Sequence, residues 1–427
     1  MEYKIFGCKV NKYYTDKWLS SKYLEWKNWI FIASCVVTDN AKRKWLKFVK
    51  DNSKNLKEWE KLFISWCWAF KDWKAQDDFF ELYPEINNLK DVIEILDEDP
   101  DKYWAPAPFK AEWLRKDKID LKKIPSWIYT KKFILIQWWC DSFCTFCLTV
   151  KKRWRHYSRS KEDILAEIID FENNWWKEVV LTWINLSAWW LDSTNDIWKS
   201  RFAELIKYLL ENTKIPRIRI SSMWPEFIND EVLELFSNNR IYPHFHYSVQ
   251  SWSTNVLKSM SRHYNWKYMK DLLNKTRNIK RTDWVKISIW ADIIVWFPNE
   301  TDEDFKDTIN LIKECNITKV HAFPFSWHNL GENVPAWNFK DQINDKIKKE
   351  RMWDIMALSD EIRDDFIDDN IWDNLDVLIE VVKKDETTWK ISWKWWTQNY
   401  IEADSSNFKV ESWKIERNQI IKWQLIK

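Results

Sequence analysis

Glycine is almost missing from this chain. Gly7 and Gly331 are the only two among 427 residues, where an ordinary chain of this length carries roughly 30. Glycine accepts positive φ and lets a backbone approach a ligand closely. Tight turns and close-contact loops have therefore lost the residue that normally forms them.

Tryptophan stands in many of these places. The chain has 36 tryptophans, and several occur where glycine makes physical sense: before Cys67 and Cys140, side by side at 189 and 190, and before Phe297. We hypothesise that a codon read as glycine by the source organism was decoded as tryptophan. The alternative is a genuinely tryptophan-rich protein, which would need buried places and N–H partners for 36 indoles.

Long apolar runs are also lacking. No stretch approaches the roughly 20 residues of a membrane span, and residues 1–6 resemble a strand rather than a signal peptide. Lysine and arginine number 67 against 65 acidic residues, so any contact with RNA must use local patches rather than an overall field. These features predict a cytoplasmic protein without a membrane segment.

Cysteine is scarce but patterned. Six of the seven cysteines form two groups of three, which favours thiolate ligands in a reducing compartment over disulfides; Cys315 is interpreted as a core or helix-end residue. Cys140, Cys144 and Cys147 form a CxxxCxxC run, whereas paired zinc sites use two CxxC or HxxxH halves. Three thiolates on one loop suit a 4Fe–4S cube and leave its fourth iron open to a ligand. The alternative is a structural cluster, or cysteines brought together by accident.

Residues 1–115 alternate short apolar strands with charged helices, which is typical of a small parallel α/β sheet. We expect strands at 3–6, 30–34 and 62–65 and helices at 15–24 and 40–52. Cys8, Cys35 and Cys67 each follow one of these strands. Because the carboxyl ends of parallel strands meet at one sheet edge, we expect the three thiols to converge there. The alternative is three unrelated core cysteines.

Residues 125–365 repeat a strand-then-helix unit, which predicts an incomplete parallel (β/α)6 barrel with its active face at the carboxyl ends of the strands. The expected strands are 134–137, 178–182, 217–221, 244–249, 286–295 and 319–323, with helices such as 161–173 and 301–315. His244 and His246 alternate along one strand, where structural hydrogen bonding is preferred over pocket lining. His321 and His328 could line the barrel opening.

Residues 366–427 change to short β segments at 377–382, 390–392, 400–402 and 420–426, which predicts a small antiparallel β-barrel. From 389 onward seven cations face four acidic residues, a local charge of 7 − 4 = +3. These cations are Lys390, Lys394, Lys409, Lys414, Arg417, Lys422 and Lys427. A second basic run, after the cysteine loop, comprises Lys151, Lys152, Arg153, Arg155 and Arg159. Together they could contact an RNA backbone, or they could simply form solvated charged faces.

Several strings together resemble one family. IQWWCDSFCTFC is similar to the cysteine run of the radical S-adenosylmethionine (SAM) enzymes. FGCKVN, ASCVVTDNAKRK and SWCWAF are similar to the N-terminal domain of the methylthiotransferases, and LTWINLSAWWLD, RIRISSMWPE, HFHYSVQSWS, IIVWFPNETDEDF and HAFPFSWH follow in family order. The chain therefore resembles the radical SAM tRNA methylthiotransferases. Lys9 and HAFPFS are most similar to the branch that modifies N6-threonylcarbamoyladenosine.

The resemblance implies two 4Fe–4S clusters. One, on the cysteine loop at 140–147, would cleave SAM to a 5′-deoxyadenosyl radical, and the other, on the three N-terminal cysteines, would supply sulfur. A second SAM would supply the methyl group. The residues implied to contact SAM are Trp189, Trp190, Ser222, Gln250 and Trp296.

The resemblance also implies partners and a substrate. The substrate would be carbon 2 of N6-threonylcarbamoyladenosine beside the tRNA anticodon, with a low-potential electron donor such as flavodoxin or ferredoxin and a TRAM-like RNA-binding domain at 366–427. Lys9, Arg153 and Arg155 are the candidate cations for the anionic threonylcarbamoyl group. One departure from the branch is the string LTVKKRW after Cys147. The alternatives are methylthiolation of isopentenyladenosine or of a ribosomal-protein aspartate, and a non-catalytic iron–sulfur RNA-binding protein.

Overall fold

The structure is a computed structural model. It describes residues 2–6, 9–19, 24, 29–35, 39–57, 59–65, 75–96, 130–138, 140, 142–147, 157–174, 176–182, 185, 189, 200–326, 334–340, 345–384, 391–404, 408–409 and 415–426. The chain divides into two compact units. The first comprises Met1–Pro125, Trp138–Tyr157 and Ser326–Trp337, and the second Ser126–Gln137, Ser158–Phe325 and Asn338–Lys427.

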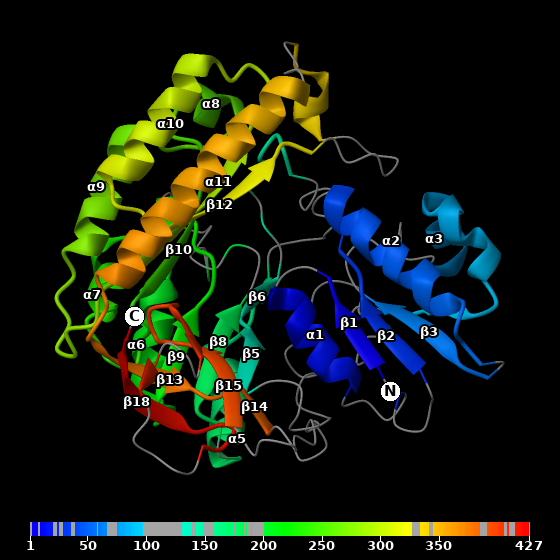
Figure 1. Cartoon of the computed structure of the whole chain (residues 1–427), viewed down its shortest axis with the longest axis horizontal. Coiled ribbons are helices and arrows are strands. Elements are labelled where there is room, and N and C mark those ends of the chain that lie inside the picture. Colours follow the sequence, from blue (N-terminus) through cyan, green and yellow to red (C-terminus); the bar gives the residue numbers. More distant parts are fainter. Residues whose placement is uncertain are drawn as a thin grey trace. The chain divides into compact units, whose positions relative to one another are not determined.

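The first unit contains a four-stranded parallel sheet, as predicted for the N-terminal part. Its strands, in spatial order, are β1 (Glu2–Ile5), β2 (Trp29–Ala33), β3 (Lys61–Ser65) and β4 (Ile93–Ile95) (Figure 1). The helical segments are α1 (Lys9–Leu19), α2 (Asp39–Ser53), α3 (Ala75–Leu82) and the 3-10 helix η1 (Pro84–Leu89). Trp45 of α2 packs with Ile32 of β2 and Ile64 of β3, so this helix covers a buried face of the sheet.

Helix α1 begins earlier than predicted. The expected helix at 15–24 starts at Lys9, because the polar side chain of Asn11 is used inside the fold rather than in a loop. Its amide nitrogen donates to the carbonyl oxygens of Phe6 (2.7 Å) and Ser34 (3.0 Å). Asn11 thereby joins the carboxyl ends of β1 and β2 and holds the first turn of this helix against the sheet.

The second unit is built on six parallel strands. In chain order they are β5 (Lys131–Leu135), β8 (Glu178–Thr182), β9 (Arg217–Ile220), β10 (His244–Gln250), β11 (Ser288–Val295) and β12 (Lys319–Pro324). Isolated parallel bridges, Ile218 to Ile241 and Met223 to Tyr247, connect the β5–β8–β9 and β10–β11–β12 sheets. The order follows the sequence, so the predicted parallel α/β architecture is confirmed.

Helices cover one face of these strands (Figure 1). They are α5 (Lys161–Asn173), α6 (Phe202–Asn212), α7 (Asp230–Leu235), α8 (Thr254–Ser259), α9 (Trp266–Arg277), α10 (Asp302–Glu314) and α11 (Asp345–Asp368). Tyr247 of β10 hydrogen-bonds Thr276 of α9 at 2.8 Å, and Ser359 of α11 bonds the backbone of Val320 in β12. Residues that alternate with Tyr247 therefore face away from the covering helices, and we call this side of the strands the interior face. Cys315 caps α10 and is fully buried, as predicted.

A buried charge cluster lies where the strands begin. Glu178, the first residue of β8, accepts hydrogen bonds from Arg219 (2.9 Å) and Tyr242 (2.6 Å), and Arg217 approaches it at 3.9 Å. Burial alone would raise the pKa of Glu178, but the two guanidinium groups outweigh it and lower the pKa to about 2. The carboxylate is therefore ionised at every physiological pH.

We expect Glu178→Gln to lower the free energy of unfolding by about 3–5 kcal/mol, because it leaves buried arginines without their counter-charge. The pKa of Glu178 is lower in the folded than in the unfolded state, so its stabilisation is complete above pH 4.5 and is lost as the pH falls toward about 2. Denaturant unfolding between pH 7 and pH 2 measures both effects. Glu231→Gln, at an exposed position of α7, is the matched control. Equal stability of the two variants at pH 7 would contradict this account.

The C-terminal part forms two small antiparallel sheets. Strand β13 (Asn374–Leu378) pairs with β18 (Ile420–Leu425), which also pairs with β17 (Phe408–Lys409), while β14 (Val381–Lys384), β15 (Ile391–Trp396) and β16 (Glu402–Asp404) form the second sheet. The single strand predicted at 377–382 is wrong. The chain changes sheets at Ile379 and Glu380, and the Glu380 carboxylate accepts a hydrogen bond from the Thr130 backbone.

Among the helices that the structure describes, none is both long enough and apolar enough to cross a bilayer. Two very short strands, β6 (Gln137–Trp138) and β7 (Tyr157–Ser158), flank the cysteine loop in sequence.

Candidate active site

The cysteine loop follows the first barrel strand in sequence. Cys140 and Cys144 are buried, Cys147 is half-buried, and none of the three is in a disulfide. Ser142 organises the first two: its hydroxyl lies 3.4 Å from the Cys140 sulfur, and its carbonyl oxygen lies 4.0 Å from the Cys144 sulfur. The Cys147 backbone N–H donates to the Cys144 carbonyl at 3.1 Å. Three reduced thiols on one compact loop form a donor set that fits three irons of a 4Fe–4S cluster.

The cysteine loop at 140–147 is also hydrogen-bonded to a segment that is distant in sequence. The Ala336 N–H donates to the Thr145 carbonyl at 2.9 Å, so the 3-10 helix at Pro335–Asn338 contacts the segment between two of the cysteines. Phe143 adopts a φ of 48° between Cys140 and Cys144. A positive φ at a bulky residue is held only where the surroundings fix it, which is common at functional sites.

The polar residues predicted at strand ends lie in the second unit. Ser222 follows β9, and its hydroxyl contacts Ser248 of β10 and Asp292 of β11, each at 3.3 Å. Gln250 ends β10 with a φ of 71° at a register shift between β10 and β11. Both residues therefore stand near the carboxyl ends of neighbouring parallel strands, where ligands of such folds bind. Their role in binding SAM stays a prediction.

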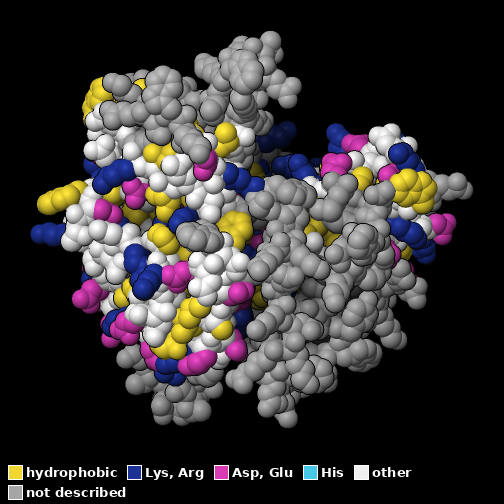
Figure 2. All heavy atoms as spheres, turned by 90° about the horizontal axis from the view of Figure 1, so that it is seen from below, with side chains coloured by type: hydrophobic (Ala, Val, Ile, Leu, Met, Phe, Trp, Pro, Cys, Tyr) yellow, Lys and Arg dark blue, Asp and Glu magenta, His cyan; other side chains and the backbone are white. Residues whose placement is uncertain are grey.

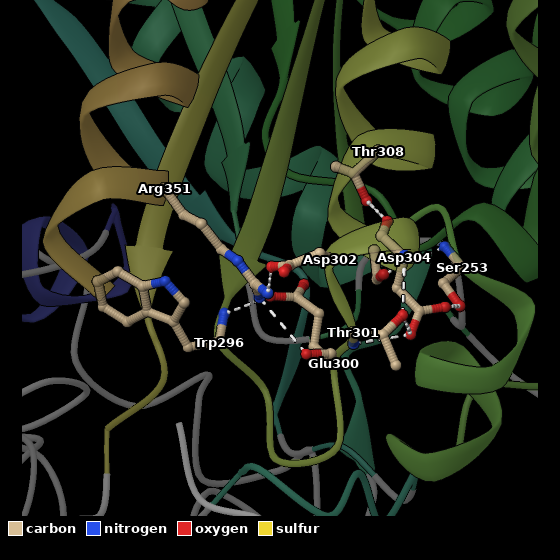
Figure 3. Close-up of polar contacts among 9 residues, drawn as sticks. Ser253, Trp296, Glu300, Thr301, Asp302, Asp304, Thr308 and Arg351 are labelled. Carbon is tan, nitrogen blue, oxygen red and sulfur yellow. Dashed lines mark hydrogen bonds and ion pairs between the residues drawn. The ribbon is translucent and has the colours of Figure 1, made fainter. Parts of the chain in front are cut away.

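The turn after β11 is held by a buried ion pair (Figure 3). The Trp296 backbone N–H donates to the Glu300 carboxylate at 2.9 Å, and Arg351 of α11 donates to the same oxygen at 2.7 Å. Arg351 also bonds Asp302 at 2.6 Å. Burial raises the pKa of Glu300 to about 7, although Arg351 and the Trp296 N–H act in the opposite direction. The turn is thus fixed by side chains from a helix that is distant in sequence.

The helix that follows this turn is capped strongly. Thr301 and Asp304 form a reciprocal capping box at the start of α10, and Asp304 also accepts from the Ser253 hydroxyl (Figure 3). The cap ties the turn after β10 to the turn after β11. The sequence TDEDF carries this signal, since threonine precedes an acidic residue at the third helical position.

The tryptophan pair predicted to approach SAM is described in part. Trp189 is buried, its indole N–H donates to the Arg159 carbonyl at 3.1 Å, and its own carbonyl accepts from the Arg201 N–H at 3.0 Å. Trp190 lies outside the described residues. Arg159 was expected to face RNA, but this is wrong: its side chain is 9% exposed, pairs with Glu167 at 2.7 Å and donates to the Leu135 carbonyl.

The N-terminal cysteines are described only at Cys35. This residue is buried after β2, beside Ser34, whose N–H and hydroxyl bond the Ser65 carbonyl at the end of β3. Cys8 and Cys67 lie outside the described residues, as do His328 and the basic residues 151–155. The carboxyl ends of β1, β2 and β3 do lie side by side, because the three strands are parallel neighbours.

The Radical SAM superfamily model matches residues 134–312. Residues 134–312 of this chain therefore form a radical SAM domain. Threonylcarbamoyladenosine tRNA methylthiotransferase MtaB of Bacillus subtilis (strain 168) is 31% identical to it, covering 69% of this chain and 63% of that protein. The protein of the same name from Thermotoga maritima is 28% identical, covering 81% and 79%. The predicted family is thereby confirmed.

A second relative has a different substrate in its name. tRNA-2-methylthio-N(6)-dimethylallyladenosine synthase of Carboxydothermus hydrogenoformans is 29% identical, covering 78% of this chain and 75% of that protein. Among solved structures, the chain is similar to the radical SAM methyltransferase TsrM from Kitasatospora setae, with a TM-score of 0.44 and 10% identity over 73% of this chain and 66% of that one. As a radical SAM enzyme, the chain uses SAM and 4Fe–4S chemistry.

Proposed function

We propose that this enzyme is a tRNA methylthiotransferase that adds a methylthio group to carbon 2 of N6-threonylcarbamoyladenosine beside the anticodon. The observation that carries the proposal is the three-cysteine loop of Cys140, Cys144 and Cys147 inside the radical SAM match, in a chain whose relatives are tRNA methylthiotransferases. The chain spans 63% of the Bacillus relative, so the activity of that whole protein is carried over as a proposal.

The reaction explains why such a cofactor is needed. Carbon 2 of adenine has neither an acidic proton nor a leaving group. Acid–base or nucleophilic catalysis therefore offers no easy route to a carbon–sulfur bond at this position. A 4Fe–4S cluster on Cys140, Cys144 and Cys147, when bound, supplies reductive cleavage of SAM. The protein's own task is to align SAM, adenine and sulfur and to keep water away. Ser222, Gln250, Trp189, Trp190 and the Trp296 turn are the proposed SAM contacts.

The sulfur source is proposed to be a second cluster on Cys8, Cys35 and Cys67. The parallel neighbours β1, β2 and β3 support it, because each cysteine follows the carboxyl end of one of these strands. We therefore assign residues 1–115 to a methylthiotransferase domain, 125–365 to a radical SAM domain and 366–427 to a TRAM-like domain. A low-potential donor, such as flavodoxin or ferredoxin, would supply electrons in the cytoplasm.

The tRNA contact is proposed to use local basic groups. On the face seen in Figure 2, basic and acidic side chains are interspersed over the described surface. In the C-terminal part, Arg417 is half-buried and Lys422 is exposed, whereas Lys390, Lys414 and Lys427 lie outside the described residues. An interspersed surface suits modest, salt-sensitive binding to a folded RNA rather than a broad electrostatic attraction.

Protein translated by its own host should methylthiolate tRNA carrying N6-threonylcarbamoyladenosine and leave tRNA carrying isopentenyladenosine unchanged. Mass spectrometry of nucleosides from both tRNAs, after incubation with SAM and reductant, measures the products. Nucleosides from cells with and without the gene provide the matching test in vivo. The opposite preference would move the enzyme to the branch of the Carboxydothermus relative. SAM binding without cleavage would favour an iron–sulfur RNA-binding protein.

A further inference from the structure

Three polar side chains meet on adjacent barrel strands. His246 of β10, Asp292 of β11 and His321 of β12 share the interior face, and Asp292 and His321 are direct register partners. The Asp292 Oδ1 atom lies 2.8 Å from His246 Nε2 and 3.5 Å from His321 Nδ1. One carboxylate oxygen therefore faces both imidazoles. Ser222 approaches the other oxygen, Oδ2, at 3.3 Å.

The electrostatics of this cluster fix how the imidazoles are presented. Burial alone would raise the pKa of Asp292, but the neighbouring His246 and His321 outweigh it and hold the pKa well below its usual range. An ionised carboxylate only accepts hydrogen bonds, so His246 donates from Nε2 to Asp292, and His321 turns Nδ1 toward the same oxygen. The opposite nitrogens, His246 Nδ1 and His321 Nε2, are then free to bind a ligand. Neither has a hydrogen-bond partner in the described part of the chain.

His244, which lies on the same strand as His246, differs from the two histidines of the cluster in its surroundings. His244, two residues earlier on β10, is 1% exposed, and its ring packs 3.9 Å from Tyr400 and 4.8 Å from Trp290. In contrast, the side chains of His246 and His321 are 14% and 31% exposed. His244 is thus buried among aromatic rings, whereas His246 stands in a partly open polar cluster. That the strand histidines serve structural hydrogen bonding stays a prediction.

The indole of Trp290 explains why the cluster has little space around it. Its ring lies 5.0 Å from His321 and 6.0 Å from His246, and its N–H has no acceptor among the described residues. Glycine at position 290, as the composition suggests, would open the volume of that indole directly beside both imidazoles. A ligand inside the barrel would then contact the cluster.

We propose that His246, Asp292 and His321 bind the polar N6 substituent of the modified adenosine and select it over a hydrocarbon substituent. This inference rests on the proposed function. A threonylcarbamoyl group carries N–H and hydroxyl groups that can donate hydrogen bonds to the free imidazole nitrogens. An isopentenyl group would cover the cluster without pairing to it, and buried unpaired polar groups are the strongest basis for rejecting a substrate.

The test compares His321→Leu and His246→Leu with His321→Gln and His246→Gln, in the chain as its own host translates it. The readouts are the kcat/KM ratio for the two tRNAs and 5′-deoxyadenosine release without tRNA. We expect each leucine variant to lower the preference for threonylcarbamoyladenosine at least about tenfold. Glutamine should restore part of it, and 5′-deoxyadenosine release should stay near that of the wild type. His263→Gln, at an exposed position, is the matched control.

The outcomes separate this inference from the proposed function. If the wild type prefers isopentenyladenosine, the proposed function fails. If the wild type prefers threonylcarbamoyladenosine and the leucine variants keep that preference, this inference fails while the function stands. The three ligand atoms also lie within 4.8 Å of one another and could hold a metal ion. Loss of a bound zinc or iron ion beyond the clusters in Asp292→Asn, measured by elemental analysis, would overturn substrate binding in favour of a metal site.

Discussion

Replacing Cys140, Cys144 and Cys147 together by alanine is expected to abolish SAM cleavage and to remove about half of the bound iron. The reason is that these three thiols are proposed to hold the cluster that cleaves SAM. Replacing Cys8, Cys35 and Cys67 should instead spare SAM cleavage and abolish methylthiolation, since those thiols are proposed to hold the sulfur source. Iron content, 5′-deoxyadenosine release under reductant and methylthio-nucleoside formation separate the two losses.

The chain supplies its own control for this experiment. Cys315 is a free, fully buried thiol at the end of α10, in a different sequence context from either triad. Cys315→Ala should therefore leave iron content and SAM cleavage unchanged. Methylthiolation that persists without Cys8, Cys35 and Cys67 would refute the sulfur-donor role, and SAM cleavage that persists without the 140–147 triad would refute the cluster assignment.

Strands of the barrel could be predicted closely because their signals are local. The apolar run at Glu178–Thr182 and the capped helix after Thr301 lie where the sequence places them. Parallel strands buried on both faces read as continuous apolar runs, and a capping box marks a helix start within a few residues. The cysteine loop was identifiable for the same reason, since its three thiols are neighbours in sequence.

Long-range partnerships could not be predicted in this way. Asp292 gave one signal, a charged residue inside an apolar strand, but its pairing with His246 and His321 depends on the register of three strands. The Arg351 contact to Glu300 joins residues 51 positions apart. Arg159 looked like part of a basic surface run, yet it is buried by a partner, Glu167, on the following helix. Such contacts follow from topology rather than from local pattern.

Backbone geometry adds an independent argument about tryptophan. Trp284, Trp296 and Trp372 adopt φ values of 60°, 68° and 73°, a region that glycine occupies freely and a bulky residue occupies with strain. Trp284 and Trp372 are also 89% and 65% exposed, which is an unfavourable setting for an indole. Trp296 is buried, and its indole N–H has no acceptor among the described residues. The positive φ values at these three positions are therefore those expected of glycine residues.

Glycine at positions 284, 296 and 372 is therefore expected to stabilise the printed chain, by about 1 kcal/mol at each position, because a left-handed backbone costs a bulky residue roughly 1–2 kcal/mol. Thermal unfolding measures the gain. Trp353→Gly is the matched control: this tryptophan is 78% exposed but lies inside α11, where glycine costs helix stability and should lower Tm. At Trp296 the change should also raise SAM cleavage, since it frees the turn beside the proposed SAM site.

Protein from the native source decides whether glycine is the residue actually present. If the decoding hypothesis holds, tryptic peptides spanning 284, 296 and 372 will carry glycine, and the intact mass will fall well below 52.6 kDa. Tryptophan in these peptides would refute the hypothesis even if the glycine variants prove more stable, because stability alone tests the backbone argument and not the origin of the residue. In that case the proposed SAM contacts at Trp189, Trp190 and Trp296 would fail with it, while the cysteine assignments would stand.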